Sequence, residues 1–388
     1  MQRSVFCSHL FRSRRPRCAA TPAARAVRRT PIRLAAAAFV AACAGGGAVT
    51  GTGPTPPPPV LPGANEYQNP VLNADFPDPA VVRGADGAYY AYATQTSGLR
   101  VQVSRSTDLV TWGTPFEAMP AKPAWASESQ NFWAPDVALR DGRYVMYFSA
   151  QIDASKRTAP DQGFCIGMAT STAPTGPFVG EAQPVVCGPE FTTIDPQGFD
   201  DPQTGKRYLY WGSGFAPIRV QELAADRASF AAGSSPAAVV PARPGQPYEN
   251  LVEGAWVTYR APYYYLFYSG DNCCGVVTNV RYAVMVARSA SPTGPFEFRG
   301  NPNGGAPVLR AGTRWLGPGH NAVVRDAAGG DWMLYHAIDG NNPYLIAGRT
   351  DLSRRVLLLD RITYGADGWP TVGVDGTPTT TPQTRPQP

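Results

Sequence analysis

Five titratable residues recur along the chain at nearly equal spacing, each at the start of a similar segment. They are Asp78, Asp136, Asp195, Glu253 and His320. Successive members lie 58, 59, 58 and 67 positions apart. Carboxylates that share one site repel each other, which raises the pKa of at least one of them and suits general acid–base chemistry. We therefore take these five residues as the candidate functional set.

Prolines flank two of these acids. Asp78 lies between Pro77 and Pro79 in "ADFPDPAVV", and Pro135 precedes Asp136 in "WAPDV". Proline fixes its own φ and lacks an N–H donor, so it would hold the neighbouring acid stiffly. If one of these carboxyl groups acted as an acid and another, on the opposite side of a binding site, acted as a base, the pair would suit glycoside hydrolysis. A gap of about 6.5–9.5 Å leaves room for a water molecule and gives inversion at the sugar carbon.

The segments that carry these residues share one layout. Each has a short strand, a tight turn and a second strand dense in Tyr, Phe and Trp, as in "DGAYYAYAT" and "APYYYLFYSG". Sequence periods near 50 residues are typical of propellers, and sustained helical periodicity is nearly absent. The sequence therefore predicts an all-β fold, a five-bladed β-propeller of four strands per blade. The five titratable residues would then occupy equal positions in a ring around the central channel.

The motifs around this ring are similar to those of glycoside hydrolase family 43. They are "NPVLNADFPDPAVVR", "NFWAPDV", "IDPQGF", "EGAW", "GHNAVV" and "LDRITYGADGWPTV", which together extend from residue 67 to about 375. That family comprises five-bladed propeller arabinanases, α-L-arabinofuranosidases and β-xylosidases. The resemblance implies that Asp78 is the general base, Glu253 the general acid, and Asp136 the residue that orients the acid and tunes its pKa. "EGAW" departs from the "EGP" or "EAP" common in the family, which changes the neighbour of Glu253 and not the acid.

Several further residues have two interpretations each. Asp195 would either cap a turn or line the sugar subsite. The aromatic residues Trp133, Trp211 and Phe215 would either stack on sugar faces or fill the interfaces between blades.

The two histidines of the globular region are treated separately. The resemblance places His320 beside a bound calcium ion or other cation, and calcium prefers oxygen ligands, here mostly water. Alternatively, His320 is only a hydrogen-bond partner in the ring. We expect His336, in the middle of a strand, to be packed rather than catalytic.

The expected substrate is an arabinose-containing plant cell-wall carbohydrate. Within the family resemblance, "GHN" and "DGWP" favour arabinan, and the long C-terminal domain of many β-xylosidases does not follow residue 375. A β-xylosidase of the same family is the first alternative. A non-catalytic carbohydrate-binding propeller and a retaining propeller that acts on sucrose or fructans are two others. We expect a monomer.

The N-terminal region has the features of an export signal. Residues 1–42 contain nine arginines and no acid, so without them the net charge falls from +5 to −4 and nucleic acid is an unsuitable partner. The basic "RAVRRTPIR", the apolar "LAAAAFVAA" and the lipobox-like "VAAC" predict a lipoprotein signal peptide and a lipid anchor on Cys43. An ordinary signal peptide is the alternative. The protein would be a cell-envelope lipoprotein or secreted, in contact with the membrane only through that anchor.

The remaining segments follow from composition and compartment. Residues 43–66 are rich in Gly and Pro and predict a tether, residues 67–375 the propeller, and residues 376–388 a disordered tail.

Export to an oxidising compartment favours disulfides. Cys165 and Cys187 flank a predicted hairpin and should pair, whereas the adjacent Cys273 and Cys274 would be either a vicinal disulfide or two thiols. The few Cys and His residues offer no zinc-site spacing.

Overall fold

The computed structural model describes residues 61–387, apart from residue 97 and residues 301–304. The predicted signal peptide, Cys43 and most of the tether lie outside the described residues. Strands dominate the described part, together with three short 3-10 turns at Ala124–Ala126, Ala154–Lys156 and Val277–Asn279. No helix in the described part of the chain is long and apolar enough to cross a membrane.

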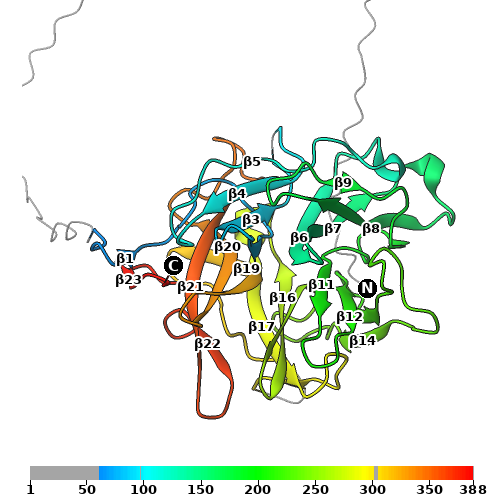
Figure 1. Ribbon diagram of the computed structural model, residues 1–388. Helices are drawn as coiled ribbons and strands as arrows, with labels where there is room; N and C mark the ends of the chain where they lie inside the picture. The colour runs from blue at the N-terminus through cyan, green and yellow to red at the C-terminus, as the bar shows by residue number, and fades with distance from the viewer. Residues whose placement is uncertain (1–60, 97, 301–304, 388) are drawn as a thin grey trace, which may run out of the picture. The chain divides into compact units, whose positions relative to one another are not determined.

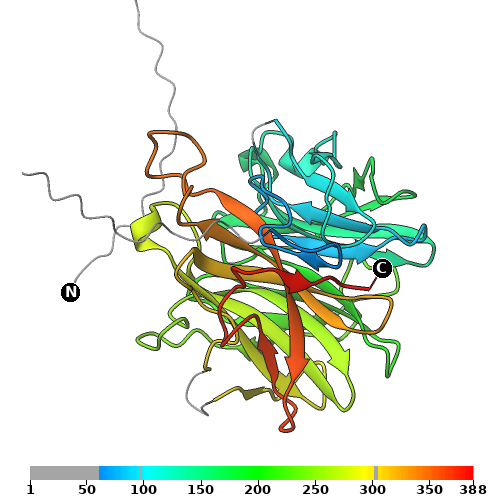
Figure 2. The same cartoon turned by 90° about the vertical axis from the view of Figure 1, so that its left-hand side faces the viewer.

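Five antiparallel sheets follow one another along the chain (Figures 1 and 2). Blade 1 contains β2 Ala80–Arg83, β3 Tyr89–Ala93, β4 Gln102–Ser106 and β5 Phe116–Glu117. Blade 2 contains β6 Phe132–Arg140, β7 Arg143–Gln151, β8 Gln162–Ser171 and β10 Val186–Pro189, with β9 Val179–Gly180 also paired to β8. Blade 3 contains β11 Gln197–Asp200, β12 Arg207–Trp211, β13 Ile218–Glu222 and β14 Ala237–Val240.

The last two blades have the same order. Blade 4 contains β15 Val252–Arg260, β16 Tyr263–Asn272, β17 Arg281–Ser289 and β18 Glu297–Phe298. Blade 5 contains β19 Trp315–Arg325, β20 Asp331–Asp339, β21 Arg355–Tyr364 and β22 Pro370–Val372. The first strand of each blade contacts the first strand of the next, and β19 of blade 5 contacts β2 of blade 1. These contacts close a ring, so the predicted five-bladed β-propeller is confirmed.

The second strand of each blade is aromatic because both of its faces are buried. Side chains alternate between the two faces of a strand. On β3, Tyr90 and Tyr92 pack toward blade 2, whereas Tyr89 and Ala91 pack toward blade 5. Three further clusters fill the other interfaces between blades in the same way. The apolar core of the protein therefore lies between the blades.

Trp211 belongs to one of these interfaces. It is 3% exposed, stacks on Phe230 at 5.5 Å between ring centroids and packs between blades 2 and 3. The alternative that Trp211 stacks on sugar is therefore wrong, because its ring is buried between the two blades and cannot reach a substrate.

The C-terminal segment is ordered, so the prediction of a disordered tail at residues 376–388 is wrong for the described residues up to 387. β23 (Gln383–Thr384) pairs antiparallel with β1 (Glu66–Tyr67). The buried Asp360 accepts a hydrogen bond from the hydroxyl of Thr379 at 2.6 Å. Strand pairing and this buried hydrogen bond give the segment more contacts than its polar composition suggested, and they tie the two ends of the described chain together.

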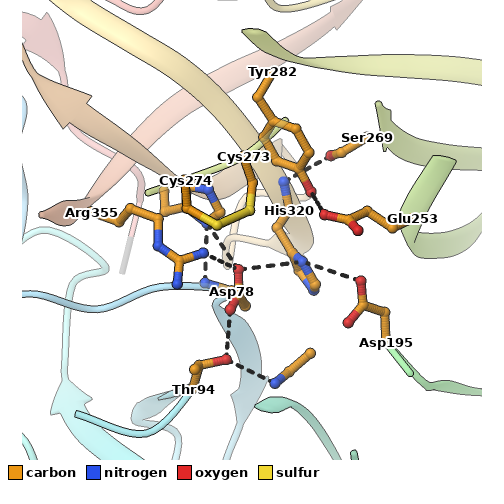
Figure 3. A network of polar contacts seen from close by, with 12 residues as sticks. Asp78, Thr94, Asp195, Glu253, Ser269, Cys273, Cys274, Tyr282, His320 and Arg355 are labelled. Atoms are coloured by element: carbon orange, nitrogen blue, oxygen red, sulfur yellow. Dashed lines mark hydrogen bonds and ion pairs between the residues drawn. A yellow bond between two sulfur atoms is a disulfide. The ribbon is translucent and has the colours of Figure 1, made fainter. Parts of the chain in front are cut away.

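Two pairs of cysteines are bonded. Cys165 on β8 and Cys187 on β10 lie directly opposite each other and form a disulfide across a sequence separation of 22. Cys273 and Cys274 are bonded to each other in the loop between β16 and β17 (Figure 3).

We expect the double substitution Cys165→Ala with Cys187→Ala to lower the free energy of unfolding by about 3 kcal/mol, because the crosslink restricts the unfolded chain over this separation. Urea denaturation of the wild type and the variant measures this loss. A variant whose unfolding midpoint equals that of the oxidised wild type would contradict the expectation.

Candidate active site

Every blade has a residue with positive φ at one equivalent position, either two residues before its first strand or within that strand. The five residues and their φ angles are Asp78 (55°), Ala134 (45°), Asp195 (58°), Gly254 (61°) and His320 (48°). In each case the residue two positions later pairs with the second strand of the blade, as Ala80 does with Tyr92 and Asp136 with Tyr147. We call these five residues the ring residues.

This register corrects the ring that the sequence predicted. Asp136 lies two residues beyond the ring residue Ala134, and Glu253 lies one residue before the ring residue Gly254. The prolines mark the position better than the acids do, because Pro79, Pro135 and Pro196 each follow a ring residue directly.

Four ring residues are held by the same kind of contact between blades. The backbone N–H of each donates to a side chain near the end of the second strand of the preceding blade. The pairs are Ala134 with Thr94 Oγ1 (2.9 Å), Asp195 with Ser149 Oγ (3.0 Å), His320 with Ser269 Oγ (2.8 Å) and Asp78 with His336 Nδ1 (3.1 Å). Since an unpaired buried N–H is costly, these contacts fix both the backbone of the ring and the angle between blades.

Blade 4 differs because its ring residue is a glycine. A Cβ on Gly254 would lie 3.2 Å from Nδ1 of His320, at a φ that side chains rarely adopt. The carboxylate of this blade comes instead from the preceding Glu253. Its Oε2 accepts a hydrogen bond from Ser213 at 2.7 Å, and its Oε1 accepts one from the hydroxyl of Tyr282 at 2.8 Å.

Asp78 is held as a carboxylate. Its Oδ1 lies 2.8 Å from Nη1 of Arg355, and its Oδ2 accepts a hydrogen bond from the hydroxyl of Thr94 at 2.6 Å (Figure 3). Burial alone would raise the pKa of Asp78, but the guanidinium of Arg355 and the Thr94 hydroxyl outweigh it and hold the pKa below its ordinary value. Asp78 is therefore ionised throughout the neutral and mildly acidic range.

Asp195 and Glu253 have the opposite electrostatic environment. Burial raises the pKa of both side chains, and the charge of Glu253 raises that of Asp195 further. Asp78 also raises the pKa of each by like-charge repulsion. Two carboxyl groups coupled in this way titrate as a pair. The pair therefore keeps a proton at a pH where Asp78 has lost its own.

His320 lies between these two environments (Figure 3). Its Nδ1 is 3.5 Å from Oδ1 of Asp78 and 3.8 Å from Oδ2 of Asp195. Burial lowers the pKa of His320, against the opposing effect of Asp78, so the imidazole is neutral at neutral pH. It separates the ionised base side of the site from the proton-bearing acid side.

Asp136 has different direct partners from those of Asp195 and Glu253. Its Oδ2 accepts a hydrogen bond from the backbone N–H of Gly198 at 2.8 Å, and the nearby charge is that of Arg140. Burial raises its pKa to about 6. It lines one cavity together with Trp256, and also the small cavity that Asp78, Asp195 and His320 line. Among the described residues, no interaction between Asp136 and Glu253 is found, whereas the charge of Glu253 raises the pKa of Asp195. The predicted tuning role of Asp136 stays a prediction.

The other two aromatic residues that were predicted to contact sugar, Trp133 and Phe215, are both accessible to solvent. Trp133 directly precedes the ring residue Ala134, is partly exposed and stacks on Phe164 at 4.4 Å between centroids. Phe215 is 62% exposed in the loop after β12.

Sequence reasoning missed Arg355, Thr94, Ser213 and Tyr282. A polar residue regularly ends the aromatic strand of each repeat, and this signal could have identified the hydroxyl ligands in "YAYAT", "YFSA" and "YWGS".

A sequence model of the family described as "Glycosyl hydrolases family 43" matches residues 67–370. The chain belongs to glycosyl hydrolase family 43. It is accordingly a glycoside hydrolase, as the motifs predicted.

Among its family 43 relatives is a Bacillus subtilis protein named "Extracellular endo-alpha-(1->5)-L-arabinanase 1". The two are 28% identical over 305 residues, which cover 76% of this chain and 86% of the relative. An Aspergillus fumigatus "Probable arabinan endo-1,5-alpha-L-arabinosidase A" is 29% identical over 334 residues, with 80% and 95% covered. The crystal structure of an exo-1,5-alpha-L-arabinanase from a bovine ruminal metagenomic library superposes with a TM-score of 0.64 at 26% identity, covering 79% of this chain and 99% of that one.

The buried carboxyl of Asp136 generates a prediction about stability. Because its folded pKa of about 6 exceeds the unfolded value of 3.8, the folded state binds the proton more tightly, and stability falls as pH rises through that interval. Relative to Asp136→Asn, the wild type should lose about 2 kcal/mol between about pH 4.5 and pH 7.5. Chemical denaturation at the two pH values measures this difference.

The same variant should keep kcat within about three-fold of wild type, since a group in acid–base catalysis contributes ~10²–10⁴-fold. A loss of kcat of that larger size would restore Asp136 to the catalytic set.

Proposed function

We propose that this family 43 enzyme hydrolyses α-1,5-linked L-arabinan or its oligosaccharides with inversion, using Asp78 as general base and Glu253 as general acid. The observation that carries the proposal is the contrast between the environments of two carboxyl groups in one buried site. Asp78 is paired with Arg355, whereas Glu253 is buried, hydrogen-bonded to two hydroxyls and coupled to Asp195. Glycoside hydrolysis requires this division between a carboxylate and a protonated carboxyl group.

The carboxylate of the general base Asp78 is held in a fixed orientation. Arg355 and Thr94 each hold one oxygen of Asp78, and the backbone N–H of Asp78 is also bonded. A carboxylate fixed in this way can align a water molecule against the anomeric carbon and accept its proton as the bond forms. Such fixed geometry reduces the entropy that must be lost in each turnover.

The acid side depends on the shared proton. With the proton on Glu253, the carboxyl group can donate it to the glycosidic oxygen as that oxygen leaves. The pKa of Tyr282 is raised well above its usual range, chiefly by burial, so its hydroxyl stays a donor and stabilises the carboxylate that results. We assign the tuning of Glu253 to Asp195 in place of Asp136, because the negative charge of Asp195 resists ionisation of its neighbour.

The choice of arabinan is supported by the relatives, two of which are named for α-1,5-L-arabinan and a third for exo-1,5-α-L-arabinanase activity. The partly exposed Trp133 and the exposed Phe215 are the aromatic residues we assign to contact with sugar. Export is supported by the relative named as extracellular. The lipid anchor on Cys43 and the monomeric state stay predictions.

The calcium ion expected beside His320 also stays a prediction. In the described part of the chain, no group of three or more His, Cys, Asp or Glu side chains is arranged to hold a metal ion. A calcium ion there would have His320 as a protein neighbour and water as its main ligand. The positive charge that balances Asp78 is already supplied by Arg355, so no catalytic step above requires a cation.

A substrate panel tests the proposed function. Linear α-1,5-arabinan, an aryl α-L-arabinofuranoside and an aryl β-D-xyloside are each incubated with the enzyme, and NMR identifies the first anomer released. We expect arabinose products with inverted configuration. Preference for the xyloside would indicate a β-xylosidase, a retained anomer would exclude the assigned base, and binding without hydrolysis would indicate a carbohydrate-binding propeller.

We expect Asp78→Ala and Glu253→Ala each to lower kcat by ~10²–10⁴-fold with intact folding. Activity of Glu253→Ala should be partly restored on an aryl glycoside with a good leaving group, which needs no protonation, whereas Asp78→Ala should stay inactive on both substrates. Steady-state kinetics on the two substrates measures the difference. Equal recovery of both variants would refute the assignment of acid and base.

Asp195→Asn should move the alkaline limb of the pH–rate profile to lower pH by about one unit or more. Removal of the negative charge beside Glu253 lowers the pKa at which the acid loses its proton. Asp136→Asn is the matched control and should leave this limb in place. The opposite pattern would return the tuning role to Asp136.

A further inference from the structure

We propose that His336 is a positioning residue that sets the geometry of the base relative to the acid. One nitrogen of its ring holds the backbone of Asp78, and the face of the ring stacks on the tyrosine that holds Glu253. The inference rests on the roles proposed above for Asp78 and Glu253.

The first contact is a hydrogen bond to the backbone of the base. His336 lies on β20 and is fully buried, and its Nδ1 accepts the N–H of Asp78 at 3.1 Å. At the equivalent contacts of the other blades the acceptor is a hydroxyl, from Thr94, Ser149 or Ser269. A hydroxyl therefore suffices to hold a ring residue, and the imidazole brings a flat aromatic face in addition.

The second contact uses that face. The rings of His336 and Tyr282 are nearly parallel, with an interplanar angle of 2° and centroids 5.7 Å apart. This spacing lies within the range of offset stacking. The Tyr282 hydroxyl donates to Oε1 of Glu253 at 2.8 Å. A single side chain therefore connects the backbone of the base to the hydroxyl that holds the acid.

The strand next to His336 is adapted to this arrangement. Gly319 on β19 pairs with His336, and a Cβ at Gly319 would lie 2.1 Å from the ring of Tyr282. Real Cβ atoms essentially never come so close to a neighbouring atom. Gly319 thus leaves the space in which Tyr282 stacks on His336.

The protonation of His336 follows from its contacts. A nitrogen that accepts an N–H bond carries no proton, so the neutral ring bears its proton on Nε2. Nε2 is buried and has no hydrogen-bond partner among the described residues. A serine at this position would bring no such buried donor, because a hydroxyl can both donate and accept.

One nearby atom offers an alternative to this tautomer. Oδ1 of Asp78 lies 3.4 Å from Nδ1 of His336, so a ring with a proton on Nδ1 would donate to the base, and it would form an ion pair if both nitrogens carried protons. Burial lowers the pKa of His336 well below its ordinary value, which opposes the charged form. The two forms differ in a measurable way, and the experiment below includes that measurement.

Two substitutions separate the two contacts of His336. His336→Phe keeps an aromatic face and loses the acceptor, so it should lower kcat about 100-fold, by the same factor on an arabino-oligosaccharide and on an aryl arabinofuranoside with a good leaving group. His336→Asn keeps an acceptor and loses the face. It should lower kcat about ten-fold on the oligosaccharide and little on the aryl substrate, because only the acid is displaced. KM should change by less than about three-fold in both.

Tyr335→Phe is the control, because Tyr335 precedes His336 on β20 and its hydroxyl bonds to the buried Asp360 on the other face of the strand. Asp78→Ala tests the proposed function separately. If Asp78→Ala is inactive while both His336 variants match Tyr335→Phe within about two-fold, the inference about His336 is wrong. If Asp78→Ala keeps more than about a tenth of wild-type kcat, the proposed role of Asp78 as general base is wrong, and the inference about His336 falls with it.

A measurement on the wild-type enzyme keeps the inference testable if the variants do not fold. Nitrogen-15 NMR of histidine-labelled protein should show His336 with a proton on Nε2, none on Nδ1, and no titration between about pH 5 and pH 8. A proton on Nδ1 would mean that His336 donates to the carboxylate of Asp78 and does not accept its backbone N–H, and would overturn the proposal.

Discussion

The site depends on a hydrogen bond from the backbone N–H of a positive-φ residue to a side chain of the preceding blade. Residues other than glycine rarely adopt positive φ, and each costs of order 1–3 kcal/mol. Ala134 adopts this conformation without any chemical group to present. We infer that the packing of the blades into a closed ring requires this backbone conformation. Asp78, Asp195 and His320 occupy the same backbone position as Ala134 in their own blades and add a titratable side chain to it. Catalytic geometry and blade packing thus share the same hydrogen bonds.

Asp78, Asp195 and Glu253 are similarly buried, yet their pKa values are shifted in opposite directions because their neighbours differ. Burial favours the protonated form of Asp78, Asp195 and Glu253 alike. Arg355 reverses this preference at Asp78 alone by direct contact. Repulsion by Asp78 strengthens the preference at the other two, and the charge of Glu253 strengthens it further at Asp195. A base and an acid therefore coexist in one small site, with the neutral ring of His320 between Asp78 and Asp195.

The repeats and the number of blades could be predicted because each blade repeats the same aromatic strand, and the family could be predicted from the motifs that carry the titratable residues. The register of the ring could not be predicted from acids alone. Aligning Asp136 with Asp78 assumed that acids mark equal positions, whereas the backbone marks them and places Ala134 there. Arg355 and Tyr282 could not be found because they reach the site from outer strands, through contacts distant in sequence. The ordered C-terminal segment was missed because its strand pairs with β1 at the other end of the described chain.

The protonation states of the ring are the central claim, and neutron diffraction of the deuterated enzyme at about pH 6 observes them directly. The account predicts no deuteron on either oxygen of Asp78, one deuteron shared by the Asp195 and Glu253 pair, and a deuteron on Nε2 of His336 with none on Nδ1. A deuteron on Asp78, or a pair of bare carboxylates at Asp195 and Glu253, would contradict it.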